Sequence, residues 1–379
     1  MHQIENFLAE SLQKRKDLAL YRILKTTENM VDFCSNDYLG FAKTGILVEG
    51  IKQELAQLEQ SHNQWVGATG SRLLAGNYAY TENLESTIAD FHGAEAGLIF
   101  NSGYDANVGV LASVPQKGDF LITDEYIHAS MIDGIRLSTA QYVRYRHNDL
   151  QHLEQLLQKY QQDEQVERII VVTESIFSMD GDETDLAALA QLKQRFAKTM
   201  LYVDEAHAIG VRGEQGLGCA EQYGVLDQID FLVGTFGKAI ASVGGYIICD
   251  SIIRDYLINK MRPLIFSTAL PPISMAWSDF IFNKVLNMHQ QRHHLAEISQ
   301  YLQQSVITKG FSSPSSSHII PIIVGESQAA IEKVCYVQQQ GFYAMPVRPP
   351  TVPQNSSRLR ISLTSMVQKA ELEKLVECL

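Results

Sequence analysis

The sequence predicts an α/β fold with two globular parts, a large domain built on a mainly parallel sheet and a smaller α+β domain at the C-terminus. Short, continuously apolar runs alternate with longer polar stretches of helical character over much of the chain. Strands that are apolar throughout are typical of sheets covered by helices on both faces, which are mainly parallel. With 379 residues, of which 45% are hydrophobic and 20% charged, the chain has enough material for one large and one smaller unit.

The domain boundaries follow from where this alternation begins and ends. Residues 1–45 are predicted to form an N-terminal helix and an arm, because apolar residues recur at loosely helical spacing up to about residue 25. Residues 46–277 are predicted as the large α/β domain and residues 278–379 as the small C-terminal domain.

The elements within these domains are predicted from apolar runs and turn residues. The strands of the large domain are expected at 98–100, 120–122, 168–172, 200–203, 231–233 and 246–248. The small domain is expected to begin with a long helix at 278–309, which ends at Gly310, and to continue through a serine-rich loop into a strand at 319–324.

Composition excludes several classes of function. The chain has 31 basic and 43 acidic residues, a net charge of −12, which argues against nucleic acid or an anionic membrane as the main partner. The N-terminus lacks the order of a secretory signal, and no apolar stretch is long enough to cross a bilayer, so we expect a soluble, cytoplasmic protein.

Cysteine and histidine spacing gives no sign of a metal or a disulfide framework. The five cysteines are scattered and include no Cys-x-x-Cys pair. His289 and His293 are one helical turn apart, but no third ligand accompanies them, so a solvated helix face is the better interpretation. No metal site is predicted.

A lysine and an aspartate follow two of the predicted strands. Asp204 comes directly after the run at 200–203, and Lys238 lies between small residues just after the run at 231–233. Ligands of such sheets collect at the carboxyl ends of the strands. This pair fits pyridoxal 5'-phosphate (PLP), because an amine can bind its aldehyde covalently and a carboxylate can keep its ring nitrogen protonated. Taken alone, Asp204 could equally well cap a strand and open a turn.

Further polar residues at strand ends could complete such a site. His207 could reach the phenolic oxygen of the ring, and His128 could lie flat against one ring face, although either histidine alone would more often be an ordinary loop residue. Gly103 precedes a predicted helix at 106–113 whose N-terminal amides could bind a phosphate, a weak signal because every α/β connection needs a turn. Ser267 and Thr268 offer further hydroxyl donors.

Arginines gather near the C-terminus. Arg348 is followed by Pro349 and Pro350, which we expect to hold the backbone extended, and Arg358 and Arg360 follow shortly after. Their guanidinium groups could bind the carboxylate of an amino-acid substrate in a bidentate manner. The alternative is an edge strand with solvated arginines.

Taken together, these motifs resemble the α-oxoamine synthase family of PLP-dependent enzymes over residues 21–364. The segments that carry the resemblance are 35–40, 70–77, 128–130, 173–182, 204–207 and 235–238. The resemblance implies the fold type I of aspartate aminotransferase. It also implies a homodimer with shared active sites, in which Ser267 and Thr268 reach the phosphate bound by the partner subunit.

Within that family, the segments 266–272 and 348–353 are most similar to the branch that makes a biotin precursor. The similarity implies a decarboxylative condensation of L-alanine with a pimeloyl thioester. The pimeloyl group would be carried on coenzyme A or on an acyl carrier protein. The implied catalytic residues are Lys238, His128, Asp204 and His207. The implied cofactor-binding residues are Gly103, Tyr104, His128, Glu174, Ser178, Asp204, His207, Thr235, Lys238, Ser267 and Thr268. The implied substrate-binding residues are Arg22, Asn36, His128, Arg348, Thr351 and Arg360.

Three other functions remain open at this point. A glycine C-acetyltransferase, or another α-oxoamine synthase, would prefer glycine and a short acyl-CoA. A PLP aminotransferase would release a keto acid and no free thiol. A non-enzymatic binding module would retain the fold without turnover.

Overall fold

The computed structural model divides the chain into two compact units. Unit 1 comprises Met1–Asn36, Met179–Asp182 and His294–Leu379, and unit 2 comprises Asp37–Ser178 and Glu183–His293. The residues that the structure describes are 3–26, 29–42, 52 and 66–379. The domain boundaries at residues 45 and 277 stay a prediction.

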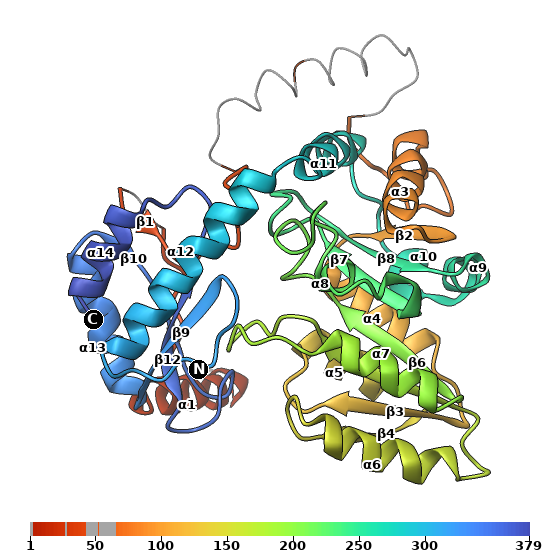
Figure 1. The fold of residues 1–379 in the computed structure, drawn as a ribbon, viewed down its shortest axis with the longest axis horizontal. Helices are drawn as coiled ribbons and strands as arrows, with labels where there is room; N and C mark the ends of the chain where they lie inside the picture. The colour runs from red at the N-terminus through yellow and green to blue at the C-terminus, as the bar shows by residue number, and fades with distance from the viewer. Residues whose placement is uncertain (1–2, 27–28, 43–51, 53–65) are drawn as a thin grey trace. The chain divides into compact units, whose positions relative to one another are not determined.

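Unit 2 is built on a seven-stranded sheet in which all strands but β8 run parallel (Figure 1). In spatial order the strands are β2 (Ala96–Phe100), β8 (Gly245–Cys249), β7 (Phe231–Thr235), β6 (Thr199–Asp204), β5 (Arg168–Glu174), β3 (Asp119–Asp124) and β4 (Gln141–Tyr145). The six predicted strands and the mainly parallel α/β class are confirmed. The sequence did not predict β4, because this edge strand is polar and mostly exposed.

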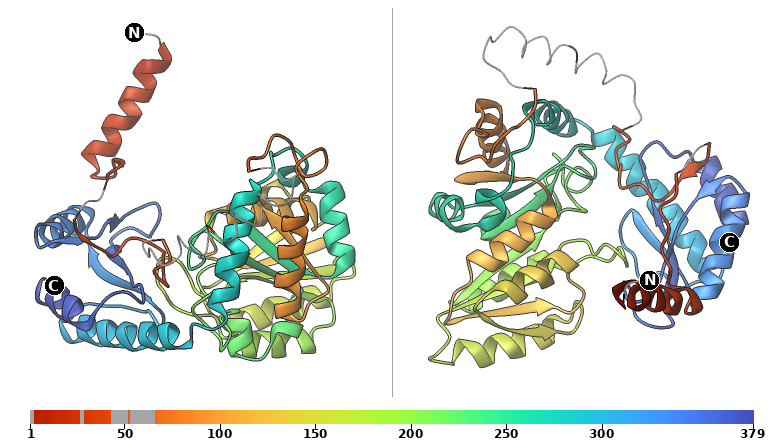
Figure 2. Two further views of the ribbon diagram at one scale, coloured as in Figure 1. Left: turned by 90° about the horizontal axis from the view of Figure 1, so that it is seen from above. Right: turned by 180° about the vertical axis from the view of Figure 1, so that it is seen from behind.

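Helices cover both faces of this sheet. On one face α4 (Gly103–Ser113) packs closely against α5 (Ala129–Leu137), and α7 (Leu186–Arg195) lies on the opposite face, as Figures 1 and 2 show from opposite sides. The other helices of unit 2 within the described residues are α3 (Ala79–His92), α6 (Leu150–Gln161), α8 (Cys219–Gln222), the 3₁₀ helix η1 (Leu226–Gln228), α9 (Ser251–Lys260), α10 (Arg262–Ile265) and α11 (Pro272–Val285). Side chains of the sheet, α4 and α5 form an apolar core cluster with residues of α9 and α10.

The predicted long helix at 278–309 is wrong, because the chain forms two helices there. α11 ends at Val285, and α12 (His289–Thr308) begins after a short break. The Arg292 side chain, 7% exposed, donates to the backbone carbonyls of Val285 and Leu286. This buried guanidinium satisfies carbonyls at the end of α11 that would otherwise lack partners, which stabilises the break.

Unit 1 contains a three-stranded antiparallel sheet of order β11 (Pro346–Val347), β12 (Ser357–Ser362) and β9 (Ile319–Gly325). A short parallel pair joins β1 (Val31–Asp32) to β10 (Phe342–Tyr343). The helices in the described part of this unit are α1 (Gln3–Asp17), most of α12, α13 (Ser327–Gln339) and α14 (Lys369–Glu377). Among the residues described, no helix combines the length and apolar character that crossing a bilayer requires.

Candidate active site

The Asp204 carboxylate lies at the end of β6 and is only 6% exposed. Its Oδ2 accepts a hydrogen bond from Asn107 Nδ2 at 2.7 Å, and its Oδ1 accepts one from the Ala206 amide at 2.8 Å. Both oxygens therefore face N–H donors. Each of the two oxygens of this buried side chain thus has a hydrogen-bond partner.

Asn107 connects Asp204 to His128 through Ser130. The second Nδ2 hydrogen bond of Asn107 goes to Ser130 Oγ at 3.0 Å, and Ser130 Oγ lies 2.7 Å from His128 Nδ1. His128 caps the N-terminus of α5 and keeps an exposed surface. Partial desolvation of its imidazole lowers its pKa, an effect that the charge of Asp204 opposes.

Sequence reasoning missed both Asn107 and Ser130 as site residues. Asn107 lies inside α4, one helical turn after Gly103, and so follows no strand. Helical spacing from Gly103, and the serine two residues after His128, were the available signals.

Glu174 is a second buried carboxyl group beside Asp204. It ends β5, and the sheet register pairs it with Asp204 on β6. Burial, and then the charge of Asp204, raise the pKa of Glu174 well above its usual range. The backbone amide of His128 donates to this group. The site thus contains two adjacent buried carboxyl groups, and burial beside Asp204 raises the pKa of Glu174.

Two of the predicted cofactor-binding residues, Gly103 and Thr235, are neighbours. A Cβ atom on Gly103 would lie 3.5 Å from the Thr235 Cβ, so the N-terminus of α4 and the end of β7 come together. Thr235 Oγ1 accepts from the Gly237 amide at 3.1 Å, which orders the turn before Lys238. Amides at a helix N-terminus beside a hydroxyl group form a site suited to a phosphate.

Lys238 and His207 both belong to unit 2 and follow the strands β7 and β6, respectively. Lys238 is half-buried, and its charge affects the pKa of His128 and of Glu174, lowering both. His207 is 6% exposed, and its Nδ1 lies 2.6 Å from the Tyr38 hydroxyl, a partner that the sequence did not predict. Ser178 is half-buried in unit 2.

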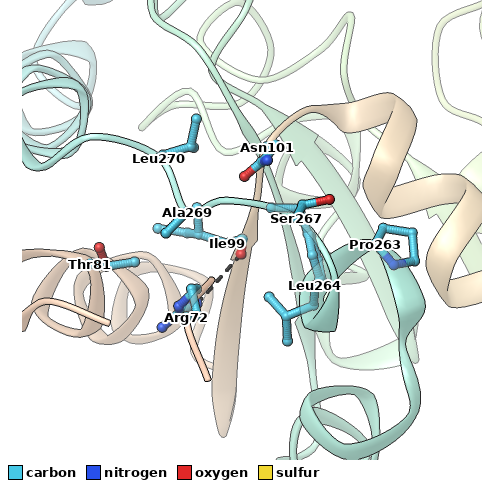
Figure 3. Close-up of a pocket in the computed structure, with 10 residues that line it drawn as sticks. Arg72, Thr81, Ile99, Asn101, Pro263, Leu264, Ser267, Ala269 and Leu270 are labelled. Carbon is cyan, nitrogen blue, oxygen red and sulfur yellow. Dashed lines mark hydrogen bonds between the residues drawn. The ribbon is translucent and has the colours of Figure 1, made fainter. Parts of the chain in front are cut away.

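Tyr104 is exposed on the first turn of α4 and lies edge-on to His128, with ring centroids 6.4 Å apart. Its hydroxyl donates to Asp133. Ser267 lines a small pocket with Asn101, shown in Figure 3, and Asn101 Nδ2 donates to the backbone carbonyl of Thr268 at 2.8 Å. This hydrogen bond connects the backbone at Ser267 and Thr268 to Asn101, the residue that follows β2.

The predicted substrate-binding residues other than His128 all belong to unit 1. Arg22 donates to Thr351 Oγ1 at 3.0 Å, and Arg360 donates to Asn36 Oδ1 at 3.3 Å. Arg348 donates to the carbonyl of Tyr21 at 3.2 Å, and partial burial, followed by the nearby Arg22 charge, lowers its pKa. Each unit therefore contains a group of the predicted polar side chains.

Arg22, Arg348 and Thr351 also line a pocket of unit 1, and the described residues of its wall include Lys16 and Lys25 and no acidic residue. Such a wall is suited to an anion. Pro349 and Pro350 lie in a turn, not in the extended backbone that the sequence predicted, because β11 ends at Val347. Arg358 does not join this group, since it forms an ion pair with Asp180.

The residues of unit 2 fit PLP by their chemistry. A buried carboxylate held by two N–H donors suits a protonated pyridine nitrogen, and a half-buried lysine suits an aldehyde. The N-terminus of α4 beside Thr235 suits the phosphate. In the part of the chain that the structure describes, no group of three His, Cys, Asp or Glu side chains is arranged to hold a metal ion.

Comparisons with known proteins agree with this fit. The model of the family "Aminotransferase class I and II" matches residues 28–379. The 8-amino-7-oxononanoate synthase of Haemophilus ducreyi is 47% identical over 99% of this chain and 100% of its own.

Solved structures give the same result. A serine palmitoyltransferase from S. paucimobilis with bound PLP has a TM-score of 0.88 at 25% identity, covering 100% of this chain and 97% of that one. An 8-amino-7-oxononanoate synthase from Francisella tularensis has a TM-score of 0.77 at 27% identity, covering 93% of this chain and 97% of that one. This chain belongs to the class I and II aminotransferase family of PLP-dependent enzymes, among relatives named 8-amino-7-oxononanoate synthase.

Proposed function

We propose that this chain condenses L-alanine with a pimeloyl thioester and releases carbon dioxide and a free thiol. The product is 8-amino-7-oxononanoate, an intermediate of biotin biosynthesis. The names of the relatives support this reaction, and so does the pairing of a buried, doubly hydrogen-bonded Asp204 with Lys238. The observation that carries the proposal is this pairing at the ends of two adjacent strands, β6 and β7.

The residues of unit 2 divide the chemistry between them. When bound, PLP supplies an aldehyde that attaches amines covalently and a ring that accepts the electron pair of a carbanion. Asp204 holds the proton on the ring nitrogen, and the Lys238 amine, once released by alanine, removes the alanine Cα proton. Gly103, Tyr104 and Thr235 bind the phosphate, Ser267 and Thr268 reach the phosphate bound by the partner subunit, and Ser178 and His207 contact the phenolic oxygen.

Acylation follows removal of the Cα proton. The alanine Cα forms a bond to the thioester carbonyl carbon, and the carbon–sulfur bond breaks to release the thiol. The resulting β-keto acid loses its carboxylate as carbon dioxide, and a proton returns to Cα. His128 assists at the thioester carbonyl, and the substrate-binding group of unit 1, which comprises Arg22, Asn36, Arg348, Thr351 and Arg360, binds carboxylates.

The test is a substrate comparison with purified holoenzyme. We expect L-alanine and pimeloyl-CoA to give thiol and carbon dioxide in equal amounts, with glycine a poor substitute. Lys238→Ala should lower kcat at least about 100-fold, because it removes the general base, whereas the exposed Lys260→Ala should not. A clear preference for glycine would favour a glycine C-acetyltransferase, and a keto acid without thiol would indicate an aminotransferase.

We also propose that the enzyme is a cytoplasmic homodimer with shared active sites. The family resemblance supports the dimer, and the apolar side chains of α1 are consistent with it. Ile4, Phe7 and Leu8 are 60%, 65% and 51% exposed, and α1 buries none of its residues within this chain. Apolar helix faces of this kind are commonly covered by a partner.

A further inference from the structure

The orientation of the Asn107 side chain is fixed by its partners. Tyr202 donates its hydroxyl hydrogen to Asn107 Oδ1 at 2.7 Å, and Asp204 Oδ2 accepts a hydrogen bond from Asn107 Nδ2 at 2.7 Å. Asn107 must therefore turn its nitrogen toward Asp204. The three side chains are almost fully buried, at 2%, 1% and 6% exposed for Asn107, Tyr202 and Asp204.

The direction of the next hydrogen bonds then follows. One Nδ2 hydrogen of Asn107 is donated to Asp204, and the other to Ser130 Oγ at 3.0 Å. Ser130 Oγ accepts this bond, so its own single hydrogen is available for His128 Nδ1, which lies 2.7 Å away. The Ser130 amide also donates to the same nitrogen, at 3.3 Å. A ring nitrogen that accepts two hydrogen bonds cannot carry a proton.

We propose that Asn107 and Ser130 are positioning residues that hold His128 as the neutral tautomer protonated at Nε2. The chain of donors runs in one direction, from Tyr202 through Asn107 and Ser130 to His128. Because Asn107 also donates to Asp204, one amide fixes both the carboxylate assigned to the ring nitrogen and the imidazole assigned to the ring face. This inference rests on the proposed function for the roles of Asp204 and His128, but the tautomer itself does not depend on any reaction.

The tautomer has a chemical consequence for the acylation step. A neutral imidazole with hydrogen on Nε2 can donate one hydrogen bond to an oxygen from that atom, while its other nitrogen stays engaged with the protein. The charged groups that act on His128 are Asp204 and Asp133, which favour its protonation, and Lys238, which opposes it. Desolvation outweighs them and lowers the pKa of His128, so the neutral form is favoured near pH 7.

The decisive experiment is ¹⁵N NMR of the histidine rings in the holoenzyme without substrate. The His128 signals are identified as those lost in His128→Gln. We expect Nδ1 to give the signal of an unprotonated nitrogen and Nε2 that of a protonated one at pH 7. An Nδ1-protonated or doubly protonated ring in the wild type would overturn the proposal, whatever the variants do and whatever substrate the enzyme uses.

Variants test whether Asn107 and Ser130 cause this state. Asn107→Ala and Ser130→Ala should each produce a mixture of tautomers at His128, and Ser130→Thr, which keeps the hydroxyl, should restore the single form. Thr199→Val is the matched control. The Thr199 hydroxyl is buried on β6 and has no hydrogen-bond partner within the described residues, so its loss should leave the His128 signals unchanged. Wild-type ring signals in both alanine variants would contradict the positioning role.

Kinetic measurements on the same variants should show whether Asn107 positions His128 or only stabilises the fold. We expect Asn107→Ala to lower kcat about 10- to 100-fold, because losing a hydrogen-bond partner that orients a functional histidine typically has an effect of this size. The KM for L-alanine should change little. The visible absorbance of bound PLP should titrate at a different pH in Asn107→Ala, because Asp204 loses one of its hydrogen-bond donors. In Thr199→Val this titration should be the same as in the wild type. An unaltered absorbance titration together with unaltered kcat would count against the proposal.

Discussion

Glu205 is a fully buried carboxyl group, next in sequence to Asp204, whose role is to hold a loop. It accepts hydrogen bonds from the amides of Cys219 at 3.0 Å and Ala220 at 2.7 Å, and from the Ser175 hydroxyl. Burial raises the pKa of Glu205 from 4.5 to about 7 in spite of these three donors. This carboxyl group connects the end of β6 to the start of α8, and so orders the backbone that carries His207.

The raised pKa of Glu205 predicts a pH dependence of stability. A carboxyl group whose pKa is higher in the folded state binds a proton on folding, so its contribution is complete below pH 4.5 and is lost as pH rises to about 7. Relative to Glu205→Gln, which does not titrate, the wild type should lose about 3 kcal/mol of unfolding free energy over that interval. Chemical denaturation of both proteins at several pH values measures the difference. Parallel profiles would show that Glu205 does not titrate there.

At the residue scale, the sequence predicted the reactive side chains and missed those that orient them. Lys238 and Asp204 could be found because a charged residue after an apolar run stands out, and because sheet ligands gather at strand ends. Asn107 gives no such signal, since its partners Tyr202 and Ser130 are distant in sequence and meet it only through packing. The roles of all these residues remain predictions to be tested.

At the scale of elements, α4 and α5 are held together by a close approach at Gly134. A Cβ atom there would lie 2.9 Å from both the Asn107 carbonyl oxygen and the Leu111 Cβ. Neither atom belongs to the end of a flexible side chain, so the helices would have to separate. The packing of two helices therefore fixes the position of Asn107, and with it Asp204 and His128.

Gly134→Ala should consequently destabilise the protein. Alanine normally favours a helix over glycine by up to about 1 kcal/mol. Here we expect the unfolding free energy to fall by about 1–3 kcal/mol, because overpacking outweighs propensity, and the absorbance of bound PLP to change as Asn107 shifts. Gly67→Ala is the control, since no atom of the described residues lies within 4 Å of its Cβ position. A Gly134→Ala protein as stable as the wild type would mean that the helices can separate without cost.

The elements that the sequence missed share a physical cause. β4 is an edge strand whose Gln141 and Arg144 face solvent, so it lacks the apolar run that marks the interior strands. The antiparallel direction of β8 could not be predicted either, because an apolar run such as 246–248 has the same pattern in a parallel and in an antiparallel strand. The break between α11 and α12 depends on Arg292, whose side chain donates a hydrogen bond to the carbonyl of Val285 at the end of the preceding helix. This contact exists only in the folded chain and leaves no pattern in the sequence.

At the scale of the whole molecule, unit 1 is assembled from segments far apart in the sequence. The short segment Met179–Asp182 belongs to it although it lies between two strands of unit 2. Asp180 forms an ion pair with the buried Arg358, and Gly181 has a φ of 69° with its Cβ position 1.9 Å from the Ile319 carbonyl oxygen. Only glycine fits there. In the sequence this segment is indistinguishable from an ordinary turn.

The proposal of shared active sites leads to a prediction that can be tested only on the assembled dimer. If Lys238 of one subunit and Ser267 of the other serve the same site, two inactive variants can restore each other. Lys238→Ala removes the amine, and Ser267→Asp places a negative charge where the phosphate of the partner's cofactor is expected to bind. In a mixed dimer one site carries both faults and the other carries neither.

Co-expression of these variants with different tags, followed by isolation of the mixed dimer, should yield about half of the wild-type activity per dimer, because one of its two sites is intact. An unsorted mixture should yield about a quarter, since half of randomly assembled dimers are mixed. If each site were built within one subunit, both sites of the mixed dimer would carry one fault, and it would be as inactive as its parents. The activity of the mixed dimer therefore decides whether the catalytic unit is one chain or two.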